Sequence, residues 1–101
     1  MMIRHIVLFN LKDYPSAEEK RKAAESVQAE LLSLKDKIAL IRAFEVGINE
    51  GENPSAYDVS MISSFASWDD LKIYQAHPAH QSFIAFNKNF SVKKVIVDYF
   101  F

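Results

Sequence analysis

The chain contains no cysteine among its 101 residues. Disulfides, zinc-thiolate sites and catalytic thiols are therefore excluded. An excess of one charge is also lacking, because 12 basic residues stand against 13 acidic ones, and like charges do not form runs. Binding to nucleic acid or to an anionic membrane surface is not expected from such a balance. Small partners that are neutral or carry mixed charge are favoured instead.

Long hydrophobic runs are missing as well, and no segment approaches the apolar length of a membrane span. At the amino end, Arg4 precedes a short apolar run, but His5 interrupts it and no small-residue cleavage site follows. We therefore expect a cytoplasmic protein. A hydrophobic content of 50% with 25% charged residues is ordinary for a globular protein, and the length predicts one domain over residues 1–101.

Hydrophobic periodicity predicts an α+β fold. Residues 2–11 are apolar on both faces, which predicts a central strand buried on two sides. Ser16 with Glu19 is a capping-box pattern that predicts a helix start. The amphipathic helix that follows has its apolar residues at helical spacing: Ala24, Val27, Leu31, Leu34 and Ile38. Residues 41–49 and 57–65 predict two further strands, paired as a hairpin across the polar loop 50–55.

The carboxyl half completes the pattern. Ser67 with Asp70 predicts a short helix over residues 68–76, a second helix follows Pro78, and residues 92–100 predict a last strand. The order fits a ferredoxin-like βαββαβ fold, a four-stranded antiparallel sheet with the helices on one face. The first strand carries Val7 and Phe9 on one face and Ile6 and Leu8 on the other, so whichever face the helices leave open would expose an apolar patch. This predicts a homodimer formed through the open face.

Two of the three histidines lie in one stretch that also holds a phenol, Tyr74-Gln75-Ala76-His77-Pro78-Ala79-His80. Pro78 cannot continue a helix but suits the first position of a new one, so the chain is expected to break and restart here. His80 then lies in a first helical turn, where the helix dipole disfavours an imidazolium and keeps the ring neutral. We interpret His77 as a cap. His80 becomes a candidate general base, and Tyr74 a candidate donor to a carbonyl oxygen or oxyanion.

Two strands supply further polar groups. His5 shares a strand face with Val7 and Phe9, and Asp98 shares one with Ile96. If His5 faces away from the helices, the cavity would lie between the sheet and its partner. His5 and Asp98 could instead be a satisfied pair within the core. The candidate substrate-binding residues are His5, Val7, Phe9, Met61, Ile96 and Asp98. No two histidines have a recognised ligand spacing on one element, so we expect no metal.

Four motifs carry a family resemblance: Ile3-Arg4-His5-Ile6-Val7-Leu8-Phe9, Tyr57-Asp58-Val59, His77-Pro78-Ala79-His80 and Val95-Ile96-Val97-Asp98-Tyr99. With them the whole chain resembles the stress-responsive A/B barrel domain (Dabb) family of the dimeric α+β barrel superfamily, and in particular olivetolic acid cyclase-like proteins. The resemblance implies a homodimer whose two sheets form a barrel, with a cavity between sheet and helices in each subunit.

The same resemblance implies a function. Tyr74 and His80 match the catalytic pair of a cofactor-independent acid-base enzyme that acts on a small carbonyl or polyketide-like substrate, and His5 and Asp98 match cavity residues. Where the olivetolic acid cyclase-like proteins have bulky aromatic side chains, this chain has Ala23, Ala24, Val27 and Ser91. A different pocket and a different ligand are therefore expected. The alternative is a non-catalytic, stress-associated dimer that binds a small apolar molecule or is purely structural.

Overall fold

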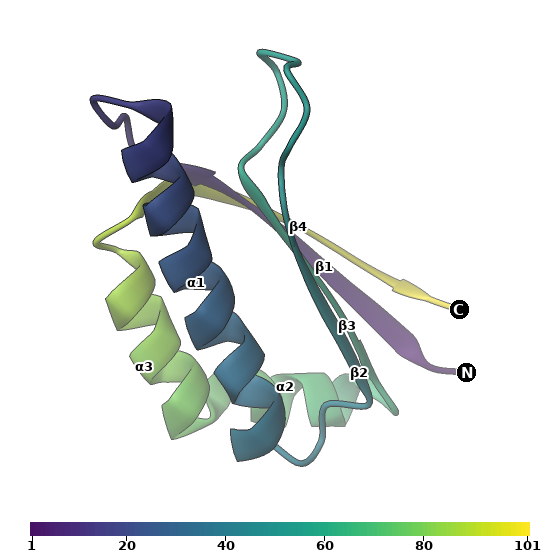
Figure 1. The fold of residues 1–101 in the computed structure, drawn as a ribbon. Helices are drawn as coiled ribbons and strands as arrows, with labels where there is room; N and C mark the ends of the chain where they lie inside the picture. Colours follow the sequence, from purple (N-terminus) through teal and green to yellow (C-terminus); the bar gives the residue numbers. More distant parts are fainter.

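A four-stranded antiparallel sheet carries three helices on one of its faces in the computed structural model, which describes all 101 residues (Figure 1). The elements in chain order are β1 (Ile3–Leu11), α1 (Ala17–Lys37), β2 (Ala43–Ile48), β3 (Val59–Phe65), α2 (Trp68–Ala76), α3 (Pro78–Asn87) and β4 (Ser91–Phe100). The strands lie in the order β2-β3-β1-β4, so β1 is central. The ferredoxin-like α+β fold expected from the sequence is confirmed.

Side chains of β1 alternate between two environments. His5, Val7 and Phe9 are buried beneath the helices, whereas Ile6 and Leu8 on the opposite face are only half-buried. The prediction of a central strand is correct. Burial on both faces is not found in the single chain, because all three helices lie on the same side of the sheet.

Helix α1 begins where its cap predicts. The Ser16 hydroxyl accepts a hydrogen bond from the Glu19 backbone N–H at 3.1 Å, which satisfies one of the free donors of the first turn. The buried side chains of α1 recur at helical spacing, and they pack on the sheet as one stripe: Ala23, Ala24, Val27, Leu31 and Leu34. Burying this stripe, more than helix propensity, stabilises the helix.

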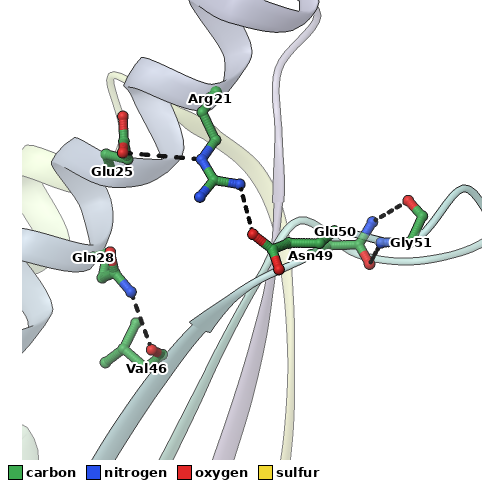
Figure 2. Close-up of polar contacts among 7 residues, drawn as sticks. All are labelled: Arg21, Glu25, Gln28, Val46, Asn49, Glu50 and Gly51. Atoms are coloured by element: carbon green, nitrogen blue, oxygen red, sulfur yellow. Dashed lines mark hydrogen bonds and ion pairs between the residues drawn. The ribbon is translucent and has the colours of Figure 1, made fainter.

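Polar contacts bind α1 to the edge of the sheet (Figure 2). The Gln28 side-chain amide donates to the carbonyl of Val46 on β2 at 3.2 Å. Two turns earlier, Arg21 pairs with Glu50 at 3.2 Å, where the hairpin loop leaves β2. The hairpin is confirmed, although β2 and β3 are each shorter than predicted, because their mutual pairing extends only from Ala43 to Ile48 on β2 and from Val59 to Ser64 on β3. No helix combines the length and the apolar character that a membrane crossing requires.

The face of the sheet opposite the helices has an apolar centre, which we call the open face. Register pairs Ile6 with Ile62 on β3 and with Val97 on β4, so these side chains lie in one row across three strands. Leu8 and Val95 form the next row. Val95 and Val97 are 38% and 58% exposed. Edge strand β4 is exposed on both faces apart from its first residue, so a single chain leaves this surface uncovered.

Candidate functional site

The break between α2 and α3 is built around His77. Its backbone N–H donates to the carbonyl of Tyr74 and ends α2, while its ring Nδ1 accepts from the Ala79 N–H at 3.0 Å and caps α3. Pro78 occupies the first turn of α3, where its missing N–H costs nothing. The interpretation of His77 as a cap is thus confirmed, and its ring nitrogen is occupied by that cap.

The break also orients His80. In a continuous helix the Gln75 carbonyl would accept the N–H of Ala79, which is instead engaged by His77. The freed Gln75 carbonyl accepts from His80 Nδ1 at 3.0 Å and from the Gln81 side-chain amide at 2.7 Å. A carbonyl is an acceptor only, so Nδ1 carries the proton in neutral His80. Nε2 then keeps its lone pair and is able to accept a proton.

The environment of His80 favours the neutral ring. Burial lowers the pKa of its imidazole below the ordinary value, the electrostatic influence of Lys94 and His5 adds to this, and the Gln75 hydrogen bond opposes it. The sequence argument predicted the neutral state but assigned it to the helix terminus. Desolvation is the larger cause, because the ring is packed against Tyr74 with 4.5 Å between ring centroids.

Tyr74 is only 1% exposed and packs between Phe65 and His80. Its hydroxyl has a single hydrogen-bond partner, the sulfur of Met61 at 3.9 Å, which is a weak acceptor. Burial raises the pKa of the phenol well above its ordinary value, so the hydroxyl keeps its proton at physiological pH. The side chain therefore offers a protonated donor whose strong hydrogen bond is still to be made.

His5 enters the same region from β1. Its Nδ1 donates to the carboxylate of Asp98 on β4 at 2.5 Å, across a direct pair of the register. Its ring lies 6.1 Å from that of Tyr74, centroid to centroid. Because Nδ1 is held by Asp98, the free nitrogen is Nε2, as in His80.

These groups line one cavity of about 290 Å³ between the sheet and the helices. Its walls are largely apolar, with Leu31, Met61 and Phe83 among the lining side chains. An apolar cavity with a few converging polar groups is the usual form of a small-molecule site. No set of three or more histidine and carboxylate side chains is arranged to hold a metal ion.

The structure brings most of the expected site residues together. Seven of the eight line the cavity: His5, Val7, Phe9, Met61, Tyr74, His80 and Ile96. Asp98 does not line it and instead holds His5 from behind. A cavity between the sheet and a partner, considered for a His5 that faced away from the helices, is wrong, because His5 lies on the helix-covered face.

Other lining residues were missed from the sequence. Gln75 acts through its backbone carbonyl, which only the helix break makes available. Leu31 had been identified as an apolar helix position, without any sign that it borders a cavity, and Phe83 on α3 lines the same cavity. Lys88 and Lys94 also line it, and the only available signal was that Lys94 alternates with Ile96 on β4.

The sequence matches the profile of the stress responsive A/B barrel domain, Dabb, over residues 3–101. The chain belongs to this Dabb family. An uncharacterised protein from Streptomyces coelicolor is 40% identical over 100 residues, which cover 99% of this chain and 100% of that protein. The family resemblance seen in the sequence is thus confirmed.

Solved structures show the same Dabb fold. A dimeric protein of unknown function with a ferredoxin-like fold, from Bacteroides fragilis, is 34% identical with a TM-score of 0.86, over 99% of this chain and 96% of that one. A hydroxynitrile lyase from Passiflora edulis is 20% identical with a TM-score of 0.79, over 97% and 91%. The latter likeness shows the fold alone.

Proposed function

We propose that this Dabb protein is a cofactor-independent acid-base enzyme that removes a proton beside the carbonyl group of a small, largely apolar substrate. The observation that carries the proposal is the pairing of two groups in opposite protonation roles. His80 is neutral with Nε2 free, and the protonated Tyr74 hydroxyl lies against it in an apolar cavity. Such divergence between neighbouring titratable groups is typical of acid-base sites.

The proposed step needs no further reactant. Tyr74 donates a hydrogen bond to the carbonyl oxygen, and His80 Nε2 takes the proton from the adjacent carbon. The C–H electron pair moves into an enolate, whose negative oxygen is stabilised by the Tyr74 hydroxyl. The imidazolium then returns its proton to the same carbon, or to the alkoxide formed when the enolate attacks a second carbonyl of the same chain in an aldol cyclisation.

Solvent deuterium exchange tests this step without knowledge of the natural substrate. The wild-type protein in D₂O is expected to speed deuterium incorporation beside the carbonyl of 1-phenylpentan-1-one, followed by NMR. His80→Ala should slow the catalysed exchange by about 100-fold or more. His77→Asn is the matched control, because asparagine is a good helix cap and the imidazole of His77 caps α3 outside the cavity lining. Equal loss in both variants, or unfolding of His80→Ala, would make His80 a structural residue.

The second candidate function is non-catalytic binding of a small apolar molecule. It is supported by the apolar walls, which favour such a ligand whether or not a reaction follows. The exchange experiment separates the two functions. Saturable binding of the ketone without any exchange by the wild-type protein would favour the binding function and refute the enzyme.

We also propose that a second copy covers the open face. The support is the exposed apolar rows of β1, β3 and β4 and the dimeric state of the Bacteroides protein. Light scattering at micromolar concentration should give a dimer. Ile6→Glu places a charge in the centre of the face and should give monomers, whereas Ser26→Glu adds the same charge on the exposed side of α1 and should not. A monomeric wild-type protein refutes the proposal.

A further inference from the structure

Charge is distributed unevenly around the cavity. Three lysines line it, Lys88, Lys93 and Lys94, and no aspartate or glutamate does so. All three are exposed, whereas the side chains at the inner end, such as Tyr74 and Met61, are almost fully buried. The cavity therefore grades from an apolar interior to a cationic rim, although the whole chain has a net charge of −1.

These rim charges are not neutralised within the chain. None of the three lysines has a carboxylate partner, whereas Lys20 and Lys22 on α1 both do. Helix α3 contains no acidic residue, and the one carboxylate of β4, Asp98, is occupied by His5. Unpaired positive charges around a concave site attract a negatively charged ligand.

Lys88 and Lys94 lie on different elements. Lys88 is the C-cap residue of α3. Lys94 on β4 pairs with Phe9 of β1, whose side chain lies on the cavity face of the sheet, so Lys94 belongs to the same face. Lys93 also borders the cavity, but it pairs with Asn10, so alternation directs its side chain toward the opposite face of the sheet. Lys88 and Lys94 are thus the two cations best placed to act on a ligand in the cavity.

We propose that the substrate or ligand of this cavity is an organic anion, an apolar carbonyl compound with a carboxylate that binds Lys88 and Lys94 while its apolar body extends toward Tyr74 and Met61. The inference rests on the proposed function for the position of the carbonyl group, and on the rim alone for the carboxylate. A carboxylate is the group for which two unpaired ammonium groups provide charge-assisted hydrogen bonds. A neutral ligand would leave both charges without a partner.

A matched pair of probes tests the charge directly. 5-Oxo-5-phenylpentanoate and its primary amide have the same length and the same ketone, and only the first is an anion. Calorimetric titration at low ionic strength should give an affinity for the acid about tenfold above that for the amide, as expected for two partly exposed ion pairs. Raising the salt concentration should reduce this ratio.

Variants assign the effect to the rim. Lys88→Gln and Lys94→Gln should each weaken binding of the acid by about threefold and leave binding of the amide unchanged. Lys72→Gln removes an unpaired charge from the exposed side of α2, outside the cavity, and should change neither affinity. Equal affinities for acid and amide, failure of the acid to bind, or equal effects of all three variants would overturn the inference.

A second readout separates this inference from the proposed reaction. His80 is faced by Tyr74 from α2, by His5 from β1 and by Lys94 from β4. A bound carboxylate offsets the Lys94 charge, so the acid should raise the pKa of His80 in an NMR titration more than the amide does. Acid preference with this shift but without deuterium exchange would keep the anion inference and reject the enzyme. If the acid and the amide bound with equal affinity and exchanged deuterium at equal rates at equal occupancy, the enzyme proposal would stand and the anion inference would be rejected.

Discussion

Replacing Tyr74 with phenylalanine should separate function from stability. The aromatic ring contributes the packing, because it is almost fully buried against Phe65 and His80. The hydroxyl contributes little, since its only hydrogen-bond partner is the Met61 sulfur at 3.9 Å. A well-made hydrogen bond would be worth about 1 kcal/mol, and a poorly partnered buried hydroxyl costs about 1–3 kcal/mol of desolvation. We therefore expect Tyr74→Phe to leave the free energy of unfolding within about 1 kcal/mol of the wild-type value, or to raise it.

The effect on catalysis should be large. If the hydroxyl stabilises the enolate oxygen, its loss should slow deuterium exchange of 1-phenylpentan-1-one by about 100-fold or more. Urea unfolding at fixed protein concentration measures the stability, and NMR in D₂O measures the exchange. Phe65→Leu is the control, because it disturbs the same packing without touching the hydroxyl and should lower stability more than the exchange rate of the folded protein. A destabilised but fully active Tyr74→Phe protein would show that the hydroxyl is structural and that the reasoning is wrong.

Three further predictions concern the same cavity. Asp98→Ala should lower the free energy of unfolding by about 1–3 kcal/mol, because buried His5 loses the acceptor of its Nδ1–H. Asp98→Asn keeps an acceptor oxygen and should lower it less. Equal urea midpoints for Asp98→Ala and the wild type would contradict this prediction. In an NMR titration His80 should have a pKa below 6.5. The unfolded chain then binds more protons than the folded chain, so the free energy of unfolding should fall as the pH drops from 6.5 through the folded-state pKa. A pKa at or above 6.5 would remove the support for a neutral base. Leu31→Ala should lower the free energy of unfolding by about 2–5 kcal/mol and enlarge the cavity, so that a ketone with a longer alkyl chain binds relatively better. If calorimetry gave the same preference between the two ketones as in the wild type, Leu31 would not limit the size of the site.

Much of the fold could be predicted because the local signals agree with the global arrangement. Ser16 and Ser67 both cap helices at the expected positions, and α2 spans the expected residues. Strand bounds were less accurate, because the hydrophobic pattern continues beyond the residues that pair between β2 and β3. Register was not predictable from alternation alone, and it is what places Asp98 beside His5.

In the stretch from Tyr74 to His80, the sequence also determined some features and the tertiary structure decided others. Pro78 and the residues around it determine that one helix ends and another begins, because proline cannot donate the hydrogen bond that would continue the first. The chain sequence also determined that His80 lies in a first helical turn. Tertiary structure decided the rest. It brought β1 and β4 beneath the break, buried the His80 ring, and gathered Lys88 and Lys94 at the rim of one cavity. Such placements depend on packing between residues far apart in the chain, for which local sequence carries no signal.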